Sequence, residues 1–177
     1  DPTRNRYLAV WEDDRDGATT SLSPHPEGQR YEILDTDIYG AFVTPGDMTV
    51  GDSFKISDTA GDGKAERFPE VAYNPISDEY MVVWQRLGGT LSPVDPYDIA
   101  SADAWRSVVA QRVDADGTLI GSNTDIEAQA YQQTTYISDV PKPAVACNTR
   151  VGTYLVTWAD TGRALTYRQL AVTGDAI

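Results

Sequence analysis

The sequence has one cysteine and one histidine among its 177 residues, and these scarcities exclude several kinds of site. A single cysteine, Cys147, cannot form a disulfide within the chain. Its counterpart in the repeat described below is Tyr73, which indicates a buried strand position. The histidine, His25, lies between two prolines and has no second histidine or cysteine pair, which argues against a transition-metal site. No nucleophile elbow and no glycine-rich phosphate loop occurs either. The sequence therefore carries no catalytic signature of its own.

Basic residues are also scarce, with 14 lysines and arginines against 27 aspartates and glutamates, a formal net charge of −13. Binding to nucleic acid or to anionic membranes needs basic patches, so this balance argues against both. No apolar run is long enough to span a membrane, so we expect no membrane insertion. An acidic surface of this kind is typical of soluble proteins outside the cell. We therefore expect an extracellular or cell-surface location, with the periplasm as the alternative.

A sustained helical period is missing as well, and a repeat of about 73 residues takes its place. Its core is a Tyr-x-x-x-Trp strand that occurs three times, with the bounding residues Tyr7 and Trp11, Tyr80 and Trp84, Tyr154 and Trp158. Turn-forming residues precede each copy, and a second β-rich run follows each copy after a connection of variable length. We interpret the recurring tryptophans as packing residues of the core.

Each full unit is predicted to hold four antiparallel strands, which we call A, B, C and D in chain order. Strand B is the Tyr-x-x-x-Trp run, and Asp-Gly or Pro-Gly turns join strand C to strand D. The chain then reads as a single array of three units, over residues 1–57 (strands B, C and D), 68–128 (all four strands) and 143–177 (strands A, B and C). Four-stranded units repeated around an axis build a β-propeller.

The pattern Pro-x-Val-Ala-Tyr-Asn, then Tyr-x-Val-Val-Trp, then Asp-Gly resembles the blade repeat of secreted or cell-surface bacterial β-propeller proteins. The resemblance covers nearly the whole chain and implies a propeller fold. A β-sandwich or a β-solenoid are the alternatives, but a sandwich needs no such repeat and a solenoid rung is usually shorter. Closed propellers have about four to eight blades. We therefore expect an incomplete ring, completed by other subunits or by the remainder of a longer chain.

The long connections, B to C and D to A, should all emerge from one face of such an array, which makes that face the candidate binding surface. Aromatic rings there suit stacking on sugars or packing on a protein, and an amide adds a polar partner. The other interpretation is that these rings hold the long loops against the blades. The candidates are Tyr31, Tyr97, Trp105, Tyr131, Gln132 and Tyr136.

One acidic stretch partly matches a calcium-binding loop. Asp58, Asp62 and Glu66 stand four residues apart around a glycine, and calcium takes six to eight oxygen ligands. The middle ligand position is Ala60, which has no oxygen in its side chain. A solvated turn explains the same residues, so Ca²⁺ is the one cofactor we consider and both interpretations stay open.

These patterns favour a non-catalytic extracellular module that binds a protein or glycan partner, or serves as a structural subunit of a surface assembly. The alternatives are a polysaccharide-active hydrolase that uses carboxylates of the loops, and an accessory subunit of a larger complex.

Overall fold

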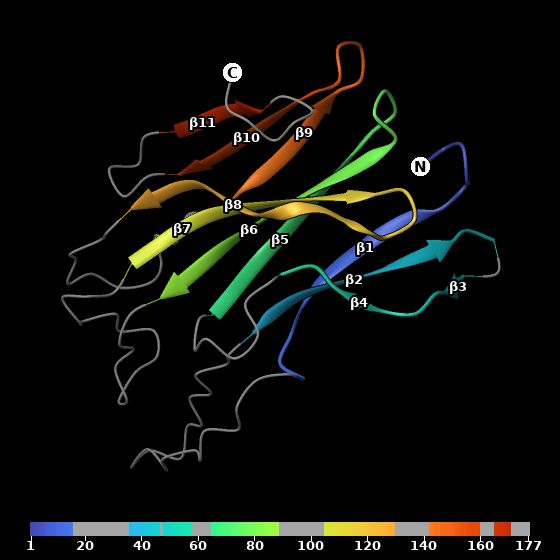
Figure 1. Ribbon diagram of the computed structural model, residues 1–177, viewed down its shortest axis with the longest axis horizontal. Helices are drawn as coiled ribbons and strands as arrows, with labels where there is room; N and C mark the ends of the chain where they lie inside the picture. Colours follow the sequence, from blue (N-terminus) through green and yellow to red (C-terminus); the bar gives the residue numbers. More distant parts are fainter. Residues whose placement is uncertain are drawn as a thin grey trace.

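The computed structural model describes residues 1–15, 36–46, 48–57, 65–88, 105–129, 142–159 and 165–170. These residues form three antiparallel sheets and no helix. The sheets fan out side by side in chain order, from the blue first sheet to the red third sheet (Figure 1). The fold is all-β, a propeller-like array of antiparallel blades with an incomplete ring, as the repeat predicts.

Within the described ranges, the first blade has strands B, C and D and no strand A. Strand D, expected as one run over residues 49–57, is broken in two where Gly51 N bonds to the carbonyl oxygen of Phe42. The strands are β1 (Tyr7–Asp13), β2 (Asp37–Thr44), β3 (Thr49–Val50) and β4 (Phe54–Lys55).

The second blade is complete and the third has strands A, B and C. The second sheet runs in the order β5 (Ala65–Asn74), β6 (Glu79–Gly88), β7 (Trp105–Asp114) and β8 (Leu119–Gln129). The third sheet contains β9 (Ala144–Asn148), β10 (Thr153–Ala159) and β11 (Leu165–Leu170).

The same backbone conformation recurs before each tyrosine of the repeat. Asn5, Asp78 and Gly152 have φ values of 48°, 55° and 72°, and each stands two residues before its tyrosine. This left-handed region favours Gly, Asn and Asp, which are the three residue types present. The three turns thus share a geometry although their sequences differ, which confirms the alignment of the repeat.

The second and third blades each pack the Tyr-x-x-x-Trp face of strand B onto the blade before it. Tyr80, Val82 and Trp84 lie in one apolar cluster with residues of the first blade. Tyr154, Val156 and Trp158 lie in a second cluster with residues of β6 and β7. Trp84 and Trp158 are buried as expected, but Trp11 is only half-buried, because none of the described blades lies against that face of β1.

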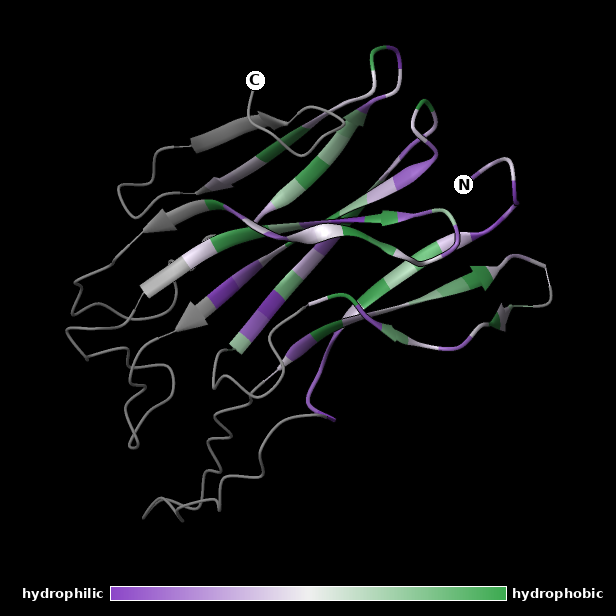
Figure 2. Ribbon diagram, viewed as in Figure 1, coloured by the Kyte–Doolittle hydropathy of each residue, from purple (hydrophilic) through white to green (hydrophobic). Residues whose placement is uncertain are grey.

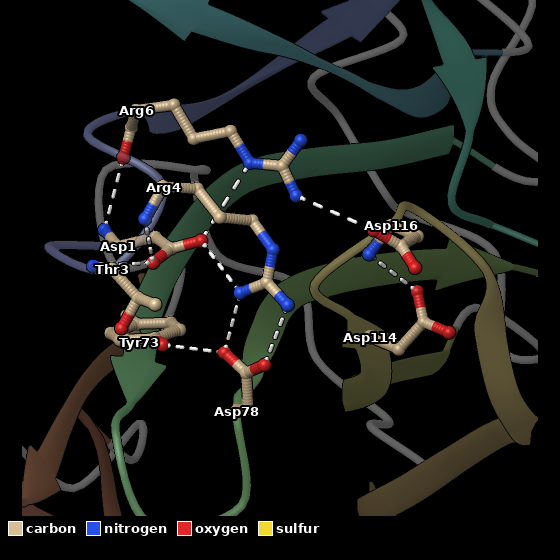
Figure 3. A network of polar contacts seen from close by, with 8 residues as sticks. All are labelled: Asp1, Thr3, Arg4, Arg6, Tyr73, Asp78, Asp114 and Asp116. Atoms are coloured by element: carbon tan, nitrogen blue, oxygen red, sulfur yellow. Dashed lines mark hydrogen bonds and ion pairs between the residues drawn. The ribbon is translucent and has the colours of Figure 1, made fainter.

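A polar network ties the first blade to the second at the end that carries the short turns (Figure 3). The Arg4 guanidinium donates to both carboxylate oxygens of Asp78, at 2.8 and 2.7 Å, and the Tyr73 hydroxyl donates to Asp78 Oδ1 at 2.7 Å. The hydrogen bonds from Arg4 and Tyr73 lower the pKa of Asp78 to about 2.

We expect Arg4→Ala to lower the melting temperature only slightly at pH 7, because the Asp78 side chain is half-exposed and water screens the pair. The pKa of Asp78 lies below its ordinary value of 3.8, so this contribution is present above pH 3.8 and fades as the pH falls toward 2. Thermal melts of both proteins across that range should converge. A difference that grows with acid would contradict this assignment.

The strand ends that carry the long connections lie together at the opposite end of the sheets, on the left in Figure 1. Several strands reach further into this end than the sequence indicates. Strand β5 begins at Ala65 rather than near residue 68, and Trp105, expected in a loop, is the first residue of β7. In none of the segments that the structure describes is a helix long and apolar enough to cross a membrane.

Candidate functional site

Buried polar side chains gather at the loop-bearing end of the first two blades. Figure 2 shows hydrophilic residues there on β5 and β6, where the middle of each sheet is largely apolar. We call this group the polar end cluster; its buried members are Thr36, Asp37, Ser57, Glu66, Gln85, Arg86 and Ser107. Buried charges need partners, so the pairings within the cluster decide what it can do.

Glu66 and Arg86 form an ion pair at the centre of the polar end cluster. They face each other across β5 and β6, and Arg86 Nε donates to Glu66 Oε1 at 2.7 Å. Burial raises the pKa of the Glu66 carboxyl, while Arg86, Ser57 and Trp84 act in the opposite direction. Both side chains are almost fully buried, so each depends on the other for stabilisation.

Ser57 connects this pair to a second carboxylate, Asp37. The Ser57 hydroxyl donates to Asp37 Oδ1 at 3.0 Å and also bonds to Glu66. Lys55 Nζ lies 2.6 Å from Asp37 Oδ2. Because a hydroxyl has one proton, it can donate to only one carboxylate at a time. Ser57 therefore shares its one proton between the two carboxylates, and its bond to Glu66 acts to lower the pKa of that group.

The backbone completes the link between the two blades. Glu66 N donates to the carbonyl oxygen of Thr36 at 2.9 Å, and the Thr36 hydroxyl donates to the Glu66 carbonyl oxygen at 2.9 Å. Two carboxylates joined through one hydroxyl resemble the acid pairs of glycoside hydrolases in composition. Both, however, are buried and paired with cations. The contacts of Asp37 and Glu66 therefore hold the loop-bearing ends of the two blades together.

A second group of residues lies where the inner strands of the three blades converge. Phe68 sits at an irregularity in β5, between Arg67 and Glu70, and has a φ of 55°, which is unusual for a bulky residue. Its N–H donates to Glu12 Oε1 at 2.8 Å, and Lys142 Nζ lies 4.5 Å from the centroid of its ring. One aromatic ring, one carboxylate and one ammonium group thus come from three blades. We call Glu12, Phe68 and Lys142 the inner-strand group.

Most residues that the sequence nominated as ligand-binding lie outside the described residues, as do two of the three calcium candidates. They are Tyr31, Tyr97, Tyr131, Gln132, Tyr136, Asp58 and Asp62. Trp105 lies at the loop-bearing end, opposite Gly88 in the pairing of β7 with β6. Glu66 is in a strand rather than in a loop, and Arg86 already occupies one of its oxygens. Among the described residues, no cluster of three or more His, Cys, Asp or Glu could hold a metal ion.

Sequence reasoning missed Arg86, Ser57 and Phe68. A signal existed for Arg86, because it follows Trp84 and Gln85 in an otherwise apolar strand, where a charged residue implies a buried partner. Nothing in the local sequence distinguishes Ser57 or Phe68. Cys147 lies in strand β9 as its counterpart Tyr73 indicates, but it is half-buried rather than buried, and burial raises the pKa of its thiol, which disfavours the nucleophilic thiolate.

Comparisons with known proteins support the propeller fold but identify no family for this chain. No family model and no curated protein matches the chain. An alpha-L-arabinofuranosidase from Fusarium graminearum superposes with a TM-score of 0.56 at 19% identity, over 97% of this chain and 40% of that one. An alpha-L-arabinanase from Penicillium chrysogenum gives a TM-score of 0.51 at 12% identity, over 97% and 40%.

A Hadza microbial sialidase is similar too, with a TM-score of 0.52 at 13% identity, over 80% of this chain and 30% of that one. These solved structures are β-propeller glycoside hydrolases. At such low identity the likeness establishes the propeller fold alone. The chain spans no more than about two-fifths of the length of these structures.

Proposed function

We propose that this chain is part of an extracellular β-propeller that acts on a polysaccharide, and that the glycan meets the loop-bearing end of the blades. The observation that carries the proposal is the likeness to the arabinofuranosidase, the arabinanase and the sialidase, all enzymes that cleave glycosidic bonds. This favours the hydrolase over the non-catalytic module as the leading hypothesis. Arabinans and sialylated glycans are the substrate classes to test first.

The inner-strand group supplies a chemically suitable contact for a sugar. Aromatic side chains present flat apolar faces on which the C–H face of a pyranose or furanose can lie. Glu12 can accept hydrogen bonds from sugar hydroxyls, and both Glu12 and Lys142 are exposed at this end. Lys142 can also pair with the carboxylate of an acidic sugar. Phe68 therefore joins Trp105 and Tyr131 as a candidate for glycan contact.

A non-catalytic glycan-binding module is the second candidate function. It is favoured by one observation: among the described residues, Asp37 and Glu66 are the buried carboxylates at the loop-bearing end, and both are held by cations. A general acid and a nucleophile must reach the glycosidic bond, which these two groups do not. The catalytic carboxylates of a hydrolase would then come from the long connections or from further blades.

Turnover and binding separate these functions. We would incubate the protein with arabinan, arabinobiose and sialyllactose, follow released sugar by chromatography, and measure binding by calorimetry. Release of arabinose or sialic acid supports the hydrolase, and binding without release supports the module. Neither release nor binding would show that the proposal is wrong for this chain.

If the loop-bearing end is the glycan surface, Phe68→Ala, Trp105→Ala and Tyr131→Ala should each weaken binding about 5- to 100-fold, as expected for the loss of an aromatic contact. Ile76→Ala is the matched control, because Ile76 is an exposed apolar residue in the short turn between β5 and β6, at the other end of the blade. Melting temperatures of all four variants check folding. Equal affinities across the set would refute the placement of the surface.

A further inference from the structure

Among the described residues, the first and third blades each expose apolar side chains on one sheet face. On the side of strand B that corresponds to the packed side of β6 and β10, β1 presents Tyr7, Ala9 and Trp11, which we call the leading face. Tyr39 and Ala41 of β2, which pair with Trp11 and Ala9 on the same side, are buried, so the exposed part of this side is the part on β1. On the opposite side of the third blade lie Ala144, Ala146, Leu155 and Thr157 of β9 and β10, which we call the trailing face. The residues of the trailing face are exposed or half-buried.

The interior of the chain shows what normally covers these two faces. Tyr80, Val82 and Trp84, which correspond to the leading face, pack on Leu8, Ile38 and Ile56 of the first blade. One blade further on, the corresponding Tyr154 and Trp158 pack on Met81 and Val83. The same two surfaces therefore meet twice within the chain, in the same orientation.

Exposure of equivalent residues marks the two uncovered faces. The tyrosine of the leading face is 64% exposed at Tyr7, but 3% at Tyr80 and 0% at Tyr154. On the trailing face, Leu155 is 45% exposed, whereas its equivalents Leu8 and Met81 are 6% and 0% exposed. Exposed apolar patches of this kind mark interaction sites, and each of these already has a matching surface on the same molecule.

We propose that a second copy of this chain covers both faces, head to tail. A two-fold axis would place the leading face of each copy on the trailing face of the other, so that two chains close one ring and no apolar sheet face remains in water. The size agrees: one chain covers 40% of the arabinofuranosidase, so two copies span about four-fifths of that length. This assembly does not depend on the proposed glycan function.

The prediction for the unmodified protein is a native mass of about twice 19.3 kDa in light scattering coupled to gel filtration. Two substitutions test the faces separately, Ala9→Arg on the leading face and Leu155→Arg on the trailing face. Each adds a charge at an exposed position, so the chain should fold and run as a monomer. Ile76→Arg is the control, since Ile76 is also exposed but lies in the turn between β5 and β6 of the second blade, on neither face. It should leave the dimer intact.

Mixing the two variants gives the most specific result. The Ala9→Arg variant keeps an unmodified trailing face, and the Leu155→Arg variant keeps an unmodified leading face. An equimolar mixture should therefore form a species of two chains that neither variant forms alone. Circular dichroism verifies that both variants are folded, and Tyr7→Glu and Thr157→Arg serve as second variants if either is not.

Several results would overturn the proposal. They are a monomeric unmodified protein at every concentration, a mass that keeps growing beyond two chains, and a dimer broken by Ala9→Arg but not by Leu155→Arg. The last of these results would indicate that the leading faces of the two copies contact each other. A monomer would leave further blades of a longer chain as the cover of these faces.

Discussion

Trp84→Ala is expected to lower the free energy of unfolding by about 3–5 kcal/mol, the usual cost of deleting a fully buried large aromatic side chain. Trp84 is completely buried in the apolar cluster between the first and second blades. The loss removes both the burial of the ring and the support it gives to the neighbouring strands. Urea denaturation followed by circular dichroism measures it.

The repeat itself supplies the matched control, because Trp11 occupies the same place in the first unit but is only half-buried. Trp11→Ala should cost well under half as much. Both substitutions are made in the Ala9→Arg background, which keeps the chain monomeric, so that the comparison reports on folding alone. Equal losses for the two tryptophans would contradict the assignment of the leading face as uncovered.

The second large effect is expected at the polar end cluster, where Arg86→Met should destabilise the protein by about 3–5 kcal/mol. Methionine fills similar space but leaves the buried Glu66 carboxylate without its cation. Adding Glu66→Gln should recover part of the loss, because the uncompensated charge is then gone. Asp125→Asn is the control: Asp125 is about half-exposed and lies 3.7 Å from Arg86, so its removal should matter little.

The pH dependence of Arg86→Met gives an independent check. Burial already raises the pKa of Glu66 above its ordinary value of 4.5, and loss of the guanidinium raises it further. A carboxyl with a raised pKa in the folded state takes up a proton on folding. Its contribution is fully present below pH 4.5 and is lost as the pH rises through the folded pKa. The destabilisation should therefore shrink as the solution is acidified, and a constant difference would contradict the ion pair.

Much of the fold was predictable because the three Tyr-x-x-x-Trp copies align the three units of the chain with one another. The positions of Tyr7, Tyr80 and Tyr154 set the strand order, and the turn residues before them set the hairpins. The repeat misjudged the burial of Trp11 and of Cys147, which are both only half-buried. Identical local sequence cannot show whether a neighbouring blade is present, since that depends on the rest of the assembly.

The loop-bearing end was less predictable, because its contacts join residues that are distant in sequence. The stretch before Glu66 is rich in Gly and Asp and indicates a loop, yet Glu66 itself lies in strand β5, where it bonds to Thr36 and Arg86. The aromatic candidates Tyr31, Tyr97 and Tyr131 stay predictions. Their positions depend on long connections whose length varies from unit to unit, so the repeat gives no template for them.

The separation of short turns from long connections has a consequence for how such a protein can change over time. Strands B and C are joined through residues 14–36 in the first unit, 89–104 in the second and 160–164 in the third, yet all three pairs are antiparallel neighbours. Insertions and deletions there leave the strand pairing intact. Mutations can therefore change the length and sequence of the long connections at one end of the blades with little effect on folding. The short turns at the opposite end and the packed interior are constrained, because the strand pairing depends on them.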